Sequence, residues 1–147
     1  MNASQLLADA LVIVLVLAAL VLAYRLWKIR QGGTAAILRD LPAVGGHGWR
    51  HGVMRYRGEE VKFHQLSSMR LSPDRRLGRR RLELVERRTP RGDEYDIMTA
   101  ETTIITLRDG SAQPNRVYEV ALDRSALTAF LSWLESSPSP RARPRPA

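Results

Sequence analysis

The sequence predicts a single N-terminal transmembrane helix followed by a small β-rich domain, a barrel or sandwich, which a C-terminal helix closes. Three observations lead to this fold class. Residues 6–27 are apolar apart from Asp9, Tyr24 and Arg25. Residues 49–122 break into short runs with β-branched side chains, separated by turn sequences. Residues 124–135 then change to the 3.6-residue period of an amphipathic helix.

The apolar stretch has the length of a membrane span, because a helix of this length reaches about 33 Å and a hydrocarbon core is about 30 Å thick. Residues 1–5 carry no basic side chain, whereas aromatic and basic anchors follow the stretch: Tyr24, Arg25, Trp27, Lys28 and Arg30. Basic residues stay on the cytoplasmic side. We therefore expect a cell (inner or plasma) membrane protein with residues 1–5 outside and the domain in the cytoplasm. The alternative is a secreted protein with a cleaved signal segment, since Ala18, Ala19 and Ala23 resemble cleavage positions.

Composition limits the remaining chain to one small domain. The protein has 147 residues, a net charge of +8 and no cysteine, which excludes disulfides and thiolate chemistry. Residues 28–48 are interpreted as a basic juxtamembrane segment with a glycine-rich hinge at residues 45–48, and residues 35–41 as a short amphipathic helical turn ended by Pro42. The domain is expected at residues 49–136, and the Pro- and Arg-rich residues 137–147 are expected to be disordered.

Within the domain, alternation and turn residues predict strands at residues 49–56, 60–66, 68–71, 81–87, 96–108 and 117–122. The closing helix, residues 124–135, has Asp123 or Ser125 as its N-cap. Its apolar stripe consists of Leu127, Phe130, Leu131 and Leu134. A lone helix after antiparallel strands is best placed at the open end of a curved sheet.

These strands, followed by a closing helix that carries Trp133, resemble the pleckstrin-homology superfold and its GRAM-like relatives. The whole chain, with its span, glycine hinge and Arg-rich hairpin, is also similar to a family of short actinobacterial single-pass membrane proteins of unknown function. The first resemblance implies recognition of a lipid headgroup, a peptide or a protein surface. It places Arg55, Arg57 and Lys62 where lipid-binding members carry basic residues, although Glu59 and Glu60 disfavour the usual inositol-phosphate pocket.

An arginine cluster is the second candidate surface. Arg75, Arg76, Arg79, Arg80 and Arg81 are expected in or beside the hairpin between the third and fourth strands, with Gly78 at its turn. Such a cluster suits anionic lipid headgroups or an unidentified protein partner, and a solvated hairpin without a ligand is the third possibility. Nucleic acid is not expected, because the cluster lacks interleaved aromatic residues.

The sequence favours a membrane-anchored binding or scaffold module over an enzyme, and we expect no cofactor. The alternative is an enzyme with a metal site formed by His47, His51 and His64. The glycines around His47 and His51 disfavour the helix that would bring these two side chains together, and no carboxylate stands at a recognisable ligand spacing.

Overall fold

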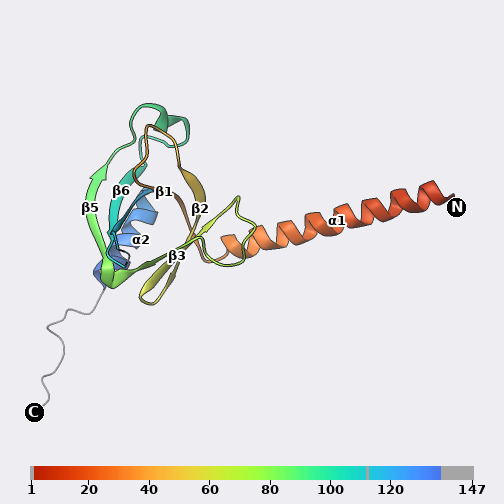
Figure 1. Cartoon of the computed structure of the whole chain (residues 1–147), viewed down its shortest axis with the longest axis horizontal. Coiled ribbons are helices and arrows are strands. Elements are labelled where there is room, and N and C mark those ends of the chain that lie inside the picture. Colours follow the sequence, from red (N-terminus) through yellow and green to blue (C-terminus); the bar gives the residue numbers. More distant parts are fainter. Residues whose placement is uncertain (1, 112, 137–147) are drawn as a thin grey trace, which may run out of the picture. The chain divides into compact units, whose positions relative to one another are not determined.

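The computed structural model describes residues 2–111 and 113–136 (Figure 1). The chain forms two compact units, Met1–Gly32 and Gly33–Ala147. The first unit is a helix and the second contains the sheet. The expected disorder of residues 137–147 concerns a segment outside the described residues.

Helix α1 (Ala3–Arg30) contains the expected span. Its segment Ala3–Lys28 is long and apolar enough to cross a membrane, and none of it is buried within the protein. Large apolar side chains are exposed along it, including Leu7 at 72% and Val21 at 67%. Because such a surface is unfavourable in water, the helix is compatible with a membrane span or a signal segment.

The second unit is a curled antiparallel sheet of seven strands, a half-barrel. The strands are β1 (Thr34–Asp40), β2 (Arg50–Arg57), β3 (Glu60–Gln65), β4 (Arg75–Gly78), β5 (Leu82–Arg88), β6 (Thr103–Asp109) and β7 (Arg116–Leu122). Their order in the sheet is β4-β3-β2-β1-β7-β6-β5. Two short 3₁₀ helices, η1 (Arg79–Arg81) and η2 (Gly92–Asp96), lie in the connections.

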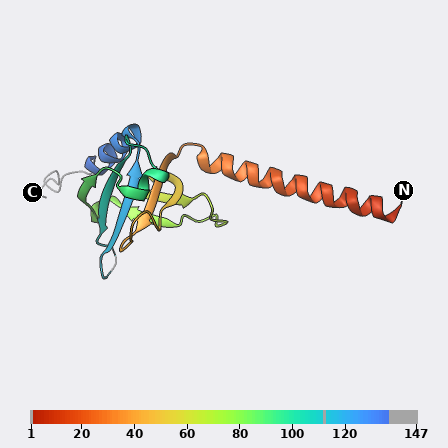
Figure 2. The ribbon, with the colours of Figure 1, turned by 90° about the horizontal axis from the view of Figure 1, so that it is seen from above.

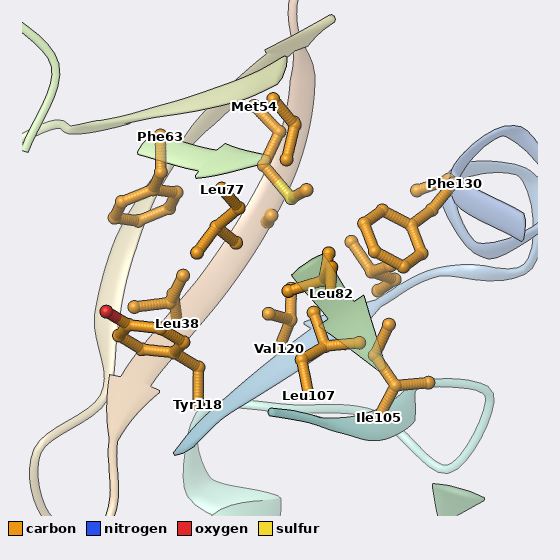
Figure 3. Close-up of a cluster of buried hydrophobic side chains, with 14 residues drawn as sticks. Leu38, Met54, Phe63, Leu77, Leu82, Ile105, Leu107, Tyr118, Val120 and Phe130 are labelled. Carbon is orange, nitrogen blue, oxygen red and sulfur yellow. The ribbon is translucent and has the colours of Figure 1, made fainter. Parts of the chain in front are cut away.

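The core lies inside the curl of the sheet. Every strand and the C-terminal helix α2 (Arg124–Glu135) contribute to one cluster of buried side chains, among them Leu38, Met54, Phe63, Leu77, Leu82, Leu107, Val120 and Phe130 (Figure 3). Leu77 of β4 and Leu82 of β5 belong to this same cluster, although their strands are the two edges of the sheet. The sheet therefore curls far enough for both edges to share one core.

Helix α2 packs against the curled sheet, as the sequence predicts (Figure 2). Asp123 is its N-cap, since its Oδ1 accepts a hydrogen bond from the Ala126 N–H at 2.8 Å. This bond lowers the pKa of Asp123. Phe130 is fully buried, and the Trp133 indole N–H donates to the carbonyl oxygen of Gly58 at 2.8 Å. The helix is thereby attached to the turn between β2 and β3.

The expected helical turn over residues 35–41 is wrong, because residues 35–40 belong to β1 in the middle of the sheet. β1 pairs with β2 on one side and β7 on the other, and it buries Ala36 and Leu38 in the core. The glycine segment at residues 45–48 consequently lies within the sheet domain rather than between it and the helix. The Arg39 guanidinium donates there to the carbonyl oxygens of Gly45 and His47, at 2.6 and 3.3 Å.

The expected strands at residues 49–56, 60–66, 81–87 and 117–122 are confirmed as β2, β3, β5 and β7. The expected strand at residues 68–71 is wrong, since these residues lie in the loop between β3 and β4. The expected strand at residues 96–108 is confirmed only in its second half, β6, because η2 and an irregular segment precede it. Met98 from that segment packs against Trp49 and Ile104 on the outer face of the sheet.

The prediction of an Arg-rich hairpin between the third and fourth strands is also wrong. β4 pairs with β3, β5 pairs with β6, and the two strands stand at opposite ends of the strand order. Helix η1 connects these two edges. Arg75 and Arg76 therefore belong to the edge strand β4, whereas Arg79, Arg80 and Arg81 form the connection between the two sheet edges.

Candidate anion-binding surface

Three cations form one row across the outer face of the sheet. Arg55 of β2 lies opposite Lys62 of β3, and Lys62 lies opposite Arg76 of β4. Their chain neighbours Met54, Val61, Phe63 and Leu77 are buried in the core. Because side chains alternate along a strand, the three cations point to the other face. We call Arg55, Lys62 and Arg76 the cationic row.

The acidic residues near this row, Glu59 and Glu60, each lie beside an arginine outside the row. Arg57 lies directly opposite Glu60. Glu59 forms ion pairs with Arg79 and, at 3.4 Å, with Arg80, and the hydrogen bond from Arg79 lowers its pKa. Among the residues that the structure describes, neither Lys62 nor Arg76 forms an ion pair. Like charges directly opposite each other destabilise a sheet, so the row is a local cost to the fold.

His64 lies beside the row, and its pKa is lowered. It follows Lys62 on the same face of β3 and lies opposite Val53. Partial burial lowers the pKa of His64, and the nearby charges of Arg55 and Lys62 lower it further, whereas Asp74 opposes them. The charges of Arg55 and Lys62 thus add to the larger effect of burial in disfavouring a positive charge on His64.

β1, which was not predicted from the sequence, precedes the strands that carry the basic residues named by the pleckstrin-homology resemblance. Arg55 and Arg57 belong to the second strand, and Lys62 belongs to the third. The loop between β1 and β2, residues 41–49, contains no Lys or Arg. The basic residues thus lie one strand further along than the resemblance implies, with Arg57 exposed and Arg55 and Lys62 half-buried.

The structure separates the five clustered arginines. Arg76 joins the cationic row, whereas Arg75 forms an ion pair with Asp40 at 2.8 Å, which raises the pKa of Arg75. Arg80 and Arg81 are exposed. Arg79 is largely buried and has a structural role.

Arg79 connects η1 to the end of α2 and to the β2–β3 turn. Its guanidinium pairs with Glu59, donates to the main-chain oxygen of Trp133 at 3.1 Å and to Ser136 Oγ at 2.6 Å. It also lies 5.7 Å from the centre of the Trp133 ring. Only 9% of the Arg79 side chain is exposed, so it offers little surface to a ligand.

A buried ion network lies on the outer face of β1, β7 and β5, and no sequence spacing indicated it. Glu119 accepts hydrogen bonds from Arg39 Nε at 2.6 Å and from Arg88 Nε at 3.1 Å. Glu94 accepts two hydrogen bonds from Arg88, at 2.7 and 2.8 Å, and one from the Arg91 N–H at 2.9 Å. The Arg39 guanidinium also stacks 4.4 Å from the Trp49 ring centre.

This network is balanced in charge and satisfied in hydrogen bonds, which indicates a structural role. Bonding to Arg88 lowers the pKa of Glu94 to about 2, with further contributions from the Arg91 N–H and the charge of Arg39. The same bonds raise the pKa of Arg88. The two carboxylates and two guanidiniums fasten η2 to the sheet. The pKa of Glu94 is thus shifted away from the raised value that suits a general acid.

The three histidines belong to different parts of the domain: His47 to the loop after β1, His51 to β2 and His64 to β3. In the described part of the chain, no three His, Asp or Glu side chains gather as metal ligands would. A shallow hollow of about 970 Å³ lies beside Pro42 and Pro114, but its lining residues Asp40 and Arg75 pair with each other. The arrangement favours no particular reaction.

The membrane anchors predicted from the sequence lie at the end of α1. The rings of Tyr24 and Trp27 lie 6.1 Å apart, and Lys28 Nζ is 5.9 Å from the Tyr24 ring centre. Arg25 is half-buried. The side chain of Arg30 lies outside the described part of the structure.

An apolar N-terminal helix followed by a curled seven-stranded sheet and a closing helix defines a class of small β-rich proteins with an N-terminal hydrophobic segment. Within this class, the chain belongs to the family described as "Protein of unknown function (DUF2550)", which matches residues 11–140. This membership confirms the coarser part of the resemblance stated from the sequence.

Relatives of this chain occur in mycobacteria. It is 66% identical over 146 residues, 99% of each chain, to "Uncharacterized protein MT1352" of Mycobacterium tuberculosis (strain CDC 1551 / Oshkosh) and to "Uncharacterized protein Rv1312" of strain ATCC 25618 / H37Rv. It is 64% identical over 135 residues, 92% of each chain, to "Uncharacterized protein ML1147" of Mycobacterium leprae (strain TN). No solved structure is significantly similar to it.

Proposed function

We propose that this protein is a single-pass membrane protein whose cytoplasmic sheet domain binds the anionic surface of the same membrane through the cationic row. The domain is a binding module of the pleckstrin-homology type rather than an enzyme. The strand order, with β1 between two antiparallel groups, and the closing helix α2 support that resemblance.

The observation that carries the proposal is the position of the row relative to the start of the domain. Three residues, 31–33, separate the end of α1 from Thr34, and they span at most about 11 Å. Thr34 lies directly opposite Met54, the residue before Arg55. The row therefore begins beside the point where the tether from the apolar helix enters the sheet.

Charge and shape favour a lipid surface as the ligand. Arg76 is exposed and Arg55 and Lys62 are half-buried, and the row follows a strand-to-strand line across the sheet, which suits an extended array of headgroups better than one small molecule. Each cation near an anionic leaflet contributes about 1 kcal/mol, so three contribute about 3 kcal/mol, a bias of roughly 100-fold in orientation. Because the domain is tethered, most of the entropic cost of association is already met.

The anchors of α1 support the orientation. Tyr24 and Trp27 suit the headgroup level, and the basic residues after them favour a cytoplasmic C-terminal side. Alkaline phosphatase fused after Ala147 should be inactive in cells. Strong phosphatase activity, or a cleaved product in the culture medium, would contradict this topology.

Energy transfer tests the lipid contact. The full chain carrying Trp27→Phe is placed in vesicles with a dansyl-labelled headgroup, so that Trp49 and Trp133 are the donors. We expect more transfer with phosphatidylglycerol than with phosphatidylcholine alone, and a loss of this gain in the Arg55→Glu, Lys62→Glu, Arg76→Glu chain. The matched control, Arg87→Glu, Arg116→Glu, Arg124→Glu, changes exposed arginines elsewhere by the same charge. No gain in the parent chain, or equal loss in the control, would refute a role for the row.

A further inference from the structure

The loop between β3 and β4, residues 66–74, exposes apolar side chains next to the cationic row. Met69 is 81% exposed and Leu71 is 88% exposed. In the described part of the sheet domain, Val44 at 83% is the one other large apolar side chain with comparable exposure. Exposing two such residues only two positions apart is unfavourable in water, so their exposure requires an explanation other than the stability of the fold.

The base of this loop is well defined. Asp74 Oδ2 accepts a hydrogen bond from the Gln65 N–H at 2.7 Å, and the Asp74 N–H donates to the Phe63 oxygen at 2.8 Å. Ser67 Oγ accepts from the Gln65 side chain at 2.6 Å. The loop thus projects from a fixed base (Figure 2, yellow-green), and its exposed apolar residues are held away from the core.

The two strands that support the loop carry the cations. Lys62 precedes it on β3, Arg76 follows it on β4, and Arg70 lies between the two apolar residues. An apolar tip on a basic stem matches the two layers of a membrane interface: anionic phosphates outside and acyl chains beneath them. An acidic protein partner would use the cations, but it would leave the apolar tip unexplained.

The loop base is also near the point where the tether enters the domain. Thr34, Met54, Phe63 and Arg75 are successive partners across β1, β2, β3 and β4. Partners in antiparallel strands are about 4.5–5.5 Å apart, so Arg75 lies within about 17 Å of Thr34. A span that ends before Thr34 therefore keeps this loop within reach of the bilayer surface.

We propose that the β3–β4 loop inserts Met69 and Leu71 into the headgroup region of an anionic bilayer while the cationic row binds the phosphates. This inference rests on the proposed function and specifies how the domain meets the membrane. It makes the loop the inserting element and the row the electrostatic contact.

Because the chain has no cysteine, single cysteines test the proposal in the full protein. Leu71→Cys and the matched control Val44→Cys each carry an NBD fluorophore, and the chain is placed in vesicles of phosphatidylcholine with or without phosphatidylglycerol. We expect a blue shift at position 71 and quenching by acyl-chain nitroxide lipids in the anionic vesicles only. The label at position 44 should keep its aqueous spectrum in both.

A second variant separates the two proposals. Ser67→Cys carries the label in a chain that also has Met69→Ser and Leu71→Ser, and there we expect loss of the quenching but retention of headgroup energy transfer. An aqueous label at position 71 together with intact headgroup transfer would overturn insertion and leave the proposed function standing. Equal insertion in neutral and anionic vesicles, or equal insertion of the labels at positions 44 and 71, would contradict the proposal that the loop inserts while the row binds phosphates.

Discussion

Lys62 and Arg76 lie directly opposite each other on β3 and β4, and neither forms an ion pair within the described residues. Opposite charges at such positions contribute about 0.2–1 kcal/mol, and like charges cost similar amounts. Lys62→Glu places an acid between Arg55 and Arg76, so it should raise the free energy of unfolding by about 1 kcal/mol. Urea unfolding of the Trp27→Phe chain in detergent micelles, followed by tryptophan fluorescence, measures this gain.

Arg57→Glu is the control, because Arg57 already lies opposite Glu60 and the change creates a like-charged pair. It should lower the unfolding free energy, although the net charge changes by the same amount. A Lys62→Glu chain that is less stable than the parent would show that the row is not a cost to the fold. A stabilising change that weakens lipid contact is the behaviour expected of a functional residue.

His64 provides a reporter for the same face. The pKa of His64 is lowered by burial and then by Arg55 and Lys62, with Asp74 acting in the opposite direction. Anionic headgroups over the row should therefore raise it. NMR titration of the imidazole in nanodiscs should give a higher pKa with phosphatidylglycerol than with phosphatidylcholine, and Lys62→Glu should raise it in neutral lipid. An unchanged pKa in anionic nanodiscs would mean that no lipid phosphate lies near this face.

The sequence was sufficient for elements whose side-chain pattern matches their burial. Helix α1 is apolar without interruption over residues 10–23, α2 has a cap and a clear stripe, and β2, β3 and β7 alternate or are β-branched. β1 was missed because Ala35 and Ala36 have low strand propensity. Pairing on both sides with β2 and β7 overrides that preference, and such pairing is invisible in a local window.

The candidate site was predictable only in part, because it depends on register. Arg55, Lys62 and Arg76 were all named from the sequence, but their alignment in one row depends on the pairing of three strands. The strand expected at residues 68–71 was suggested by Met69 and Leu71, which are in fact exposed. β4 was overlooked since Leu77 is its single buried residue among charged neighbours and a glycine.

Arg79 and Arg80 are adjacent in sequence and should behave differently on substitution. Arg79→Ala removes the bonds to Glu59, Trp133 and Ser136 and the ring contact, so it should lower the unfolding free energy by about 1–3 kcal/mol. Arg80 is 71% exposed and touches only Glu59 among described ion-pair partners, and Arg80→Ala should change stability by less than about 0.5 kcal/mol. Thermal unfolding by circular dichroism compares the two, and equal losses would contradict the role assigned to Arg79.

Glu94 makes the stability of the domain sensitive to acid. Its pKa is lowered from 4.5 to about 2 by Arg88, the Arg91 N–H and Arg39. A carboxyl group with a lowered native pKa stabilises the fold above the unfolded value, and this contribution, about 3 kcal/mol, is lost as the pH falls from 4.5 towards 2.

Glu94→Gln should therefore cost about 3 kcal/mol at pH 7 and flatten the decline in stability across that acid range. Urea unfolding at a series of pH values measures both effects. Glu101→Gln, at an exposed position, is the control and should change the unfolding free energy by less than about 0.5 kcal/mol. If the unfolding free energy of Glu94→Gln declined between pH 4.5 and 2 as steeply as that of the parent chain, the network would not be the cause of the acid sensitivity.

The most direct test of the lipid contact uses the scarcity of lysine. The chain contains two lysines, Lys28 and Lys62, so the Lys28→Arg chain labelled with ¹⁵N-lysine has a single side-chain amine signal. Solid-state NMR in phosphatidylglycerol-containing bilayers then measures dipolar coupling between Lys62 Nζ and the lipid ³¹P. We predict clear dephasing of the Lys62 signal, which weakens at high salt. A Lys62 signal with no phosphorus coupling in well-folded protein would contradict the proposal that the cationic row binds the membrane.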